Sequence, residues 1–296
     1  MARKQTILLY GRTRAGKTTQ IGELAEHVYK TTSKITRLYT ADRGGVDSIK
    51  PYVDLGIIEV ICQDDTSPWV FLNKASRGMI RDTNNKWVLD KAANEKVGFY
   101  AFESMTAFAD ALMTDLAVKS ADNQNVGGGS NINFTVVSDG ETLKISGNNM
   151  SHYNVVQSRI TEEVWQSQKL DADYLLWTAS VSRDDDATSN AKVLGPEVVG
   201  KKLTAEVPRW FNLSFRIDCT PASKVPPKPE SHILYLGNSL DASAGNAVSL
   251  GNTRTPKDSP VLPSSIEPAS LVEALKLIEG SKDAAVKTIK ARLGLK

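Results

Sequence analysis

An apolar run leads into a glycine-bounded loop near the start of the chain: Thr6-Ile7-Leu8-Leu9-Tyr10-Gly11-Arg12-Thr13-Arg14-Ala15-Gly16-Lys17-Thr18. Thr6 to Tyr10 has the continuous apolar pattern of a strand that is covered on both faces. From Lys17 to Tyr29 apolar residues recur at helical spacing. A strand, a G-x-x-x-x-G-K-T loop and a helix, in that order, predict a phosphate-binding P-loop. The alternative is a glycine turn without a ligand.

The chemistry of a P-loop assigns a role to each part of this segment. Backbone N–H groups of the loop point at phosphate, the lysine reaches the β and γ phosphates, and the hydroxyl holds Mg²⁺. We therefore expect a nucleoside triphosphate, taken to be ATP, with Lys17 as a catalytic group and Thr18 as a Mg²⁺ ligand. The residues expected to line the nucleotide are Gly11, Arg12, Thr13, Arg14, Ala15, Gly16, Lys17, Thr18 and Thr19. The two loop arginines either add charge to the phosphates, reach a neighbouring subunit, or are simply solvated.

Three polar residues that follow apolar runs complete the predicted site. Glu103 follows Phe99 to Phe102, and a carboxylate there would hold the water shell of Mg²⁺, or else cap the next helix. Asp42 follows Leu38 to Ala41, where it would orient the attacking water, or else form an Asx-turn. Ser180 ends the run that starts at Leu175, where it would sense the γ-phosphate, or else be a surface serine. We predict that Asp42, Glu103 and Ser180 join Lys17 as catalytic residues and that Glu103 joins Thr18 at the metal.

The alternation of strand and helix patterns predicts an α/β core with βαβ units and a mostly parallel central sheet flanked by helices. We expect this core to span residues 1–265. A mobile excursion that holds a β-hairpin is predicted at 120–150, because this segment is rich in Asn, Gly and Ser, and its residues 132–145 alternate around Ser138-Asp139-Gly140. The polar segment 183–200 is predicted to be a mobile loop. A C-terminal helical tail is expected over 266–296.

Composition narrows the class of protein. The 296 residues carry a net charge of only +2, so no overall cationic field indicates a nucleic-acid partner. Cys62 and Cys219 lie in apolar runs without metal-ligand spacing and are predicted to be buried free thiols. No segment has the ~20 apolar residues that span a bilayer. We expect a soluble cytoplasmic protein without a membrane partner.

A nucleic-acid groove would need a local cluster of basic and aromatic groups. The acidic run Asp184-Asp185-Asp186 opposes a simple phosphate track, so direct DNA contact stays open. The candidates are Arg159, Arg183, Lys192, Lys201, Lys202 and the segment from Asn131 to Tyr153.

Taken together, these groups resemble a RecA-like P-loop NTPase core, and more narrowly the phage-encoded RecA-like single-strand annealing recombinases. Gly11 to Thr18 resembles the Walker A loop, and Phe99 to Ser104 resembles the Walker B strand. The segment Leu38 to Asp42 is similar to the strand that ends in the family's catalytic glutamate, and Leu175 to Ser182 is similar to its sensor strand. Residues 195–202 resemble the turn after the second mobile loop. The sequence departs from the family at Asp42, where glutamate is usual, and at Glu103, where aspartate is usual, which puts the rate of hydrolysis in doubt.

The resemblance implies an ATPase that acts on single-stranded DNA in phage recombination or replication, with ATP held between subunits of a ring or filament. It also implies that the segments 120–149 and 183–200 face DNA. The alternative is an assembly or structural component of a phage machine that binds nucleotide with slow or no hydrolysis. A nucleotide kinase is disfavoured, because the segment 120–149 contains no arginine for a lid.

Overall fold

The structure is a computed structural model. It describes residues 4–42, 44–63, 67–121, 132–138, 141–147, 150–185, 192–220, 222–224, 227–228, 230–237, 240–241, 247–249, 252–253 and 259–293.

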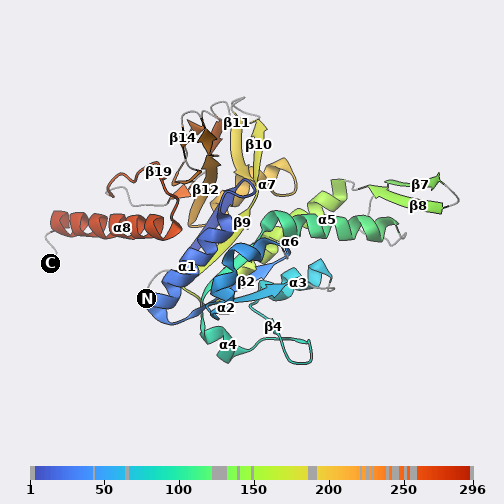
Figure 1. Ribbon diagram of the computed structural model, residues 1–296, viewed down its shortest axis with the longest axis horizontal. Coiled ribbons are helices and arrows are strands. Elements are labelled where there is room, and N and C mark those ends of the chain that lie inside the picture. Colours follow the sequence, from blue (N-terminus) through green and yellow to red (C-terminus); the bar gives the residue numbers. More distant parts are fainter. Residues whose placement is uncertain are drawn as a thin grey trace.

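A mostly parallel sheet forms the centre of the molecule (Figure 1). Every neighbouring pair from β3 to β12 is parallel, whereas the strands beyond β12 are antiparallel. The predicted α/β architecture is therefore confirmed. In spatial order the strands are β3 (Ile58–Cys62), β2 (Ile35–Thr40), β6 (Val97–Glu103), β9 (Tyr174–Ala179), β1 (Gln5–Gly11), β12 (Leu213–Thr220), β15 (Ser231–Tyr235) and β19 (Ser265–Ile266), with β18 (Asn252–Thr253) also paired to β12.

Helices cover both faces of this sheet, so its central strands are buried. On one face α1 (Lys17–Thr32) and α8 (Leu271–Leu293) bury Ile21, Leu24 and Ile278 in a single apolar cluster. On the other face, α3 (Pro68–Ala75), α5 (Met105–Ala121) and α6 (Met150–Ser167) pack in a second cluster. The shorter helices are η1 (Gly45–Ile49), α2 (Lys50–Asp54), α4 (Lys91–Glu95), α7 (Lys201–Glu206) and η2 (Val207–Trp210).

Small antiparallel sheets project from this core. The predicted hairpin between α5 and α6 is present as β7 (Ile132–Ser138) and β8 (Glu141–Gly147), which extend well away from the main sheet (Figure 1). The predicted mobility of this segment falls partly on residues 122–131, which lie outside the described residues. The other small strands pair as β4 (Ile80–Arg81) with β5 (Trp87–Val88), β13 (Ser223–Lys224) with β14 (Pro227–Lys228), and β16 (Leu240–Asp241) with β17 (Ala247–Ser249).

The structure differs from the sequence prediction after the strand β9. In place of the predicted mobile loop over residues 183–200, β10 (Val181–Asp185) and β11 (Lys192–Pro196) form an antiparallel pair. The buried Tyr10 hydroxyl donates to the Leu194 carbonyl at 3.2 Å, which ties this pair to the core strand β1. The polar sequence of this segment gives little strand signal, because strand formation depends on the packing context as well as on local propensity. Residues 186–191 lie outside the described residues.

Two smaller differences also have local causes. The sequence pattern from Pro68 to Met79 is helical, but α3 ends at Ala75, because the chain turns at Gly78, whose φ of +70° is left-handed. Cys62 and Cys219 are free thiols as predicted, but both are half-buried rather than buried. The C-terminal segment forms one helix, α8, whose first half contacts α1. The division into a core and a tail stays a prediction.

Candidate functional site

The glycine loop connects β1 to α1 at the carboxyl edge of the parallel sheet, and two of its glycines are required by geometry. Gly16 precedes the first residue of α1 with a φ of +93°, a left-handed conformation that side chains disfavour. A Cβ on Gly11 would lie 2.1 Å from the carbonyl oxygen of Ile217 on β12. Among the described residues no side chain caps the start of α1, and its first turn holds no acidic residue. The N-terminus of α1 is therefore suited to an anion.

Lys17 lies over the loop that it belongs to. Its ammonium donates to the carbonyl oxygens of Gly11 at 2.8 Å and Arg12 at 2.9 Å. Burial lowers the pKa of Lys17, and the nearby Glu103 carboxylate opposes this change. Lys17 is thus a partly desolvated cation that donates to neutral carbonyl oxygens. A phosphate oxygen in their place would accept a stronger, charge-assisted hydrogen bond.

Thr18 and Glu103 meet below the loop. The Thr18 hydroxyl donates to Glu103 Oε1, across 85 residues of sequence. Glu103 is only 6% exposed, and its Oε2 has no hydrogen-bond partner among the described residues. Burial raises the pKa of Glu103 to about 7, while the Thr18 hydrogen bond and the Lys17 charge oppose the rise and the Asp42 charge adds to it. Ser104, not Glu103, caps α5, because its Oγ accepts from the Ala107 N–H at 3.1 Å.

Asp42 lies near Glu103, since Thr40 and Glu103 are register partners on β2 and β6. Its carboxylate Oδ1 accepts the Gly44 N–H at 2.9 Å, so the Asx-turn considered for this residue is present. The turn occupies one carboxylate oxygen.

Ser180 lies at the same sheet edge, one residue beyond the Tyr10–Ala179 pair of β1 and β9. Its backbone is held from two sides. The N–H donates to Thr106 Oγ1 at 2.9 Å, and the carbonyl accepts from the Glu197 N–H at 2.8 Å. The structure thus brings Lys17, Thr18, Glu103 and Asp42 together, with Ser180 on the neighbouring strand end.

The remaining loop residues divide by exposure. Ala15 is fully buried, whereas Arg12, Thr13, Arg14 and Thr19 are exposed. The Arg12 guanidinium reaches only a distant contact, 3.9 Å from Asp218 on β12. The loop arginines therefore stand in solvent, as one of the sequence alternatives has it.

Sequence reasoning missed two residues that contact or approach the loop. His232 on β15 places Nδ1 3.0 Å from the Ala15 carbonyl oxygen. Asp218 pairs with the buried Arg216 at 2.8 Å and lies near Arg12. Neither residue follows a recognisable motif, and only the pairing of β12 with β1 and β15 brings them to the loop.

Mg²⁺ fits the donors at Thr18 and Glu103. A hydroxyl and a buried carboxylate with an unpartnered oxygen are hard oxygen donors of the kind that Mg²⁺ prefers. A triphosphate fits the N-terminus of α1 and Lys17 for the electrostatic reasons given above.

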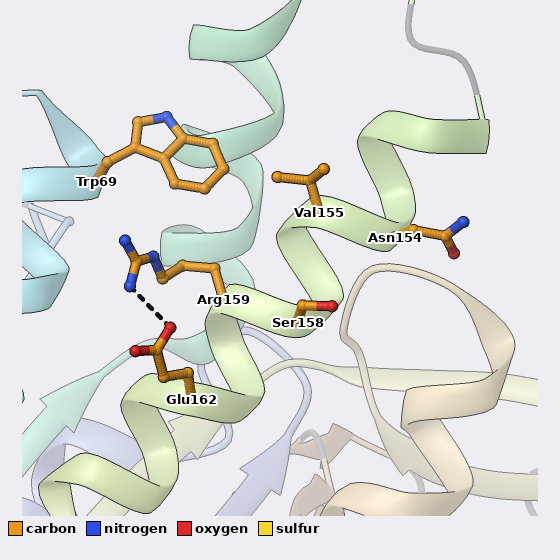
Figure 2. A pocket seen from close by; sticks show the side chains of 6 residues that line it. All are labelled: Trp69, Asn154, Val155, Ser158, Arg159 and Glu162. Carbon is orange, nitrogen blue, oxygen red and sulfur yellow. Dashed lines mark hydrogen bonds and ion pairs between the residues drawn. The ribbon is translucent and has the colours of Figure 1, made fainter. Parts of the chain in front are cut away.

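Of the basic candidates for nucleic-acid binding, the structure describes the side-chain contacts of Arg159. Arg159 pairs with Glu162 at 2.9 Å and with the fully buried Glu163 at 2.8 Å. It lines a pocket of about 410 Å³ between α3 and α6, opposite Trp69, as Figure 2 shows. Because two carboxylates neutralise Arg159, the prediction that it offers positive charge to DNA is weakened. The backbones of Arg183, Lys192, Lys201 and Lys202 lie on β10, β11 and α7.

No protein-family model and no curated protein sequence matches the chain. The chain is similar to the crystal structure of a RadB recombinase, with a TM-score of 0.41 and 14% identity over 78% of this chain and 80% of that chain. It is also similar to a KaiC-like protein, PH0186 from Pyrococcus horikoshii OT3, with a TM-score of 0.42 and 11% identity over 78% and 77% of the two chains. Similarity at this level does not identify a substrate or a partner. None of the described helices is long and apolar enough to cross a membrane.

Proposed function

We propose that the chain binds ATP with Mg²⁺ at the Gly11–Thr18 loop and hydrolyses it to ADP and phosphate. The observation that carries this proposal is the contact between the Thr18 hydroxyl and the buried carboxylate of Glu103, whose charge also acts on Lys17. A structural glycine turn would not need a buried acid, a hydroxyl and a desolvated ammonium at one point.

Each residue has a role that follows from its chemistry. Lys17 exchanges its carbonyl partners for the β and γ phosphates, and the loop N–H groups hold the phosphate oxygens. Thr18 and Glu103 hold Mg²⁺, which supplies positive charge beside the phosphates when it is bound. Asp42 orients the attacking water and accepts its proton, and Ser180 contacts the γ-phosphate.

We extend the proposal to a RecA-like, phage-encoded ATPase that acts on single-stranded DNA, with ATP at subunit interfaces of a ring or filament. Two features support this extension. Exposed Arg12 and Arg14 lie where a neighbouring subunit could contact them, and the β7–β8 hairpin follows the helix after Glu103, where the family resemblance implies a DNA-facing segment. The near-neutral net charge requires that any DNA contact be local.

An assay of phosphate release tests the ATPase proposal and its extension to single-stranded DNA separately. The purified chain is assayed with ATP and Mg²⁺, with and without single-stranded DNA at low salt, and Lys17→Ala serves as the inactive reference. Release that depends on Lys17 supports the ATPase. Stimulation by DNA supports the extension, whereas absence of both stimulation and DNA binding rejects the extension but leaves the ATPase.

A second candidate is an assembly protein that holds nucleotide without turnover. The Asx-turn favours it, because the Asp42 carboxylate already accepts the Gly44 N–H. Light scattering after size exclusion, with ATP, with ADP and without nucleotide, distinguishes the two. A complex of fixed stoichiometry under all three conditions, together with no phosphate release, would favour the assembly protein.

A further inference from the structure

Three side chains with metal-binding atoms meet beside the glycine loop, on the side of the loop formed by β12 and β15. Cys219 and His232 are direct register partners on these antiparallel strands. Partners in such a pair place their side chains on the same face of the sheet. Glu230 precedes β15 by one residue, so its carboxylate can reach the same point.

The distances suit a shared ion. Glu230 Oε1 lies 3.2 Å from Cys219 Sγ and 3.6 Å from His232 Nε2, and the three ligand atoms all lie within 4.8 Å of one another. Tetrahedral Zn²⁺ with ordinary bond lengths separates its donor atoms by about 3.3 to 3.6 Å. Cys219 and His232 are half-buried and Glu230 is exposed, which leaves a side open for a fourth ligand.

The orientation of His232 adds a second, independent observation. Its Nδ1 lies 3.0 Å from the Ala15 carbonyl oxygen, and a carbonyl can only accept. Nδ1 therefore carries the proton in this contact, and Nε2 presents a lone pair towards Cys219 and Glu230. A histidine that ligates metal through one nitrogen and donates the other N–H to a backbone carbonyl is the usual arrangement in metal sites.

We propose that Cys219, Glu230 and His232 bind Zn²⁺, and that the bound ion stabilises the glycine loop through the hydrogen bond from His232 to Ala15. Thiolate and imidazole donors select a borderline-soft ion such as Zn²⁺ over Mg²⁺ or Ca²⁺. Three protein ligands leave one coordination position for water. This site is separate from the Thr18–Glu103 donors, which lie on the β6 side of β1 rather than the β12 side.

The proposed ion has a consequence for nucleotide binding. Ala15 is fully buried and Gly16 approaches the His232 ring, since a Cβ on Gly16 would lie 3.4 Å from Nδ1. Bound Zn²⁺ would fix the His232 ring and so hold the glycine loop in its present conformation. A preorganised loop binds nucleotide more tightly, because less conformational freedom is lost on binding. We expect Zn²⁺ to raise affinity for a nucleotide by about fivefold or more, and the nucleotide to raise Zn²⁺ affinity by the same factor.

Metal titration of the full chain tests the site without reference to ATPase activity. Metal-free protein is titrated with Zn²⁺ in competition with a chromophoric chelator, and with Co²⁺ as a spectroscopic probe. We expect one equivalent to bind and Co²⁺ to give a thiolate charge-transfer band. Cys219→Ser should lose the band, because the thiolate is gone. It should also bind Zn²⁺ at least about tenfold more weakly, since even the loss of a group that only orients a ligand costs about 10- to 100-fold in metal affinity.

Cys62→Ser is the matched control, because Cys62 is also a half-buried free thiol but lies on β3, away from the cluster. It should keep the band and the affinity. His232→Gln and Glu230→Gln should each weaken Zn²⁺ binding, and circular dichroism confirms that each variant is folded. Should Cys219→Ser misfold, the milder Glu230→Gln change at an exposed position decides the outcome.

The proposal is overturned if Cys219→Ser or Glu230→Gln binds Zn²⁺ as tightly as the unaltered chain, or if Cys62→Ser loses the band. The coupling to the loop is overturned if a non-hydrolysable ATP analogue, in excess Mg²⁺, binds equally well with and without Zn²⁺. Failure of nucleotide binding alone would reject the proposed function and leave the metal site standing.

Discussion

The Thr18 hydroxyl donates a hydrogen bond to a carboxylate oxygen of Glu103, and this contact joins the first turn of α1 to the end of β6. The carboxylate is buried, and its second oxygen has no partner among the described residues. Water no longer solvates this acid, so its pKa rises to about 7. Without a bound cation, keeping the buried Glu103 carboxylate ionised therefore lowers the stability of the folded protein.

Protonation of Glu103 should link folding stability to pH. Its pKa rises from 4.5 to about 7 on folding, so the folded state binds the proton more tightly than the unfolded state. This contribution is fully present below pH 4.5 and is lost as pH rises through 7, by about 3 kcal/mol in all. Urea unfolding of metal-free protein at several pH values measures it. Glu103→Gln should flatten the profile and be the more stable protein at about pH 8; parallel profiles for the two proteins would refute the linkage.

Removal of the loop ammonium should abolish most nucleotide affinity. Lys17→Ala removes the ammonium that is predicted to contact the β and γ phosphates, and hydrogen bonds to charged groups contribute about 1.5 to 3 kcal/mol. We expect a loss of about 10- to 100-fold in ATP affinity by titration calorimetry. Lys50→Ala is the matched control, because Lys50 is an exposed lysine of α2 that pairs with Asp54. Equal affinities of the two variants would contradict the assignment of Lys17.

Asp42 can be tested without breaking its turn. Asn at this position keeps an oxygen that accepts the Gly44 N–H, but it cannot accept a proton from water. Asp42→Asn should therefore leave ATP affinity unchanged and reduce the turnover rate by about 100-fold, which is typical for loss of a general base. Single-turnover phosphate release measures the rate. If the rate is unaltered, Asp42 serves the turn only and another group activates the water.

Alanine substitutions at two glycines should change the stability of the protein in opposite directions. At Gly11 the new Cβ would meet the Ile217 carbonyl oxygen at 2.1 Å, so β1 and β12 must separate, at a cost of about 1 to 3 kcal/mol. At Gly280, inside α8, a Cβ meets nothing within 4 Å. Gly280→Ala should thus stabilise the protein by about 0.5 to 1 kcal/mol. Thermal unfolding checks both signs, and a stable Gly11→Ala protein would argue against the close approach of the two strands.

Local patterns predicted much of the fold from the sequence. The strand patterns of Thr6 to Tyr10, Ile35 to Thr40, Val97 to Phe102 and Asp173 to Ser180 correspond to β1, β2, β6 and β9, because buried strands of a parallel sheet are rich in apolar residues. The hairpin β7–β8 followed from alternation around a turn sequence. Short or polar elements were missed, including α4 and the β10–β11 pair. Partners that are distant in the sequence stabilise such elements, and a local pattern does not contain them.

The sequence by itself determined the glycine loop and the ends of the strands that carry Asp42 and Glu103, since backbone N–H groups, one lysine and one hydroxyl lie within eight consecutive residues. Only the tertiary structure decided which distant groups meet there. It placed Glu103 against Thr18, and His232 against Ala15 across 217 residues of sequence. It also paired Cys219 with His232, whose spacing along the chain resembles no metal motif. These contacts depend on the order and register of the strands, which is set by the packing of the whole sheet rather than by any one segment.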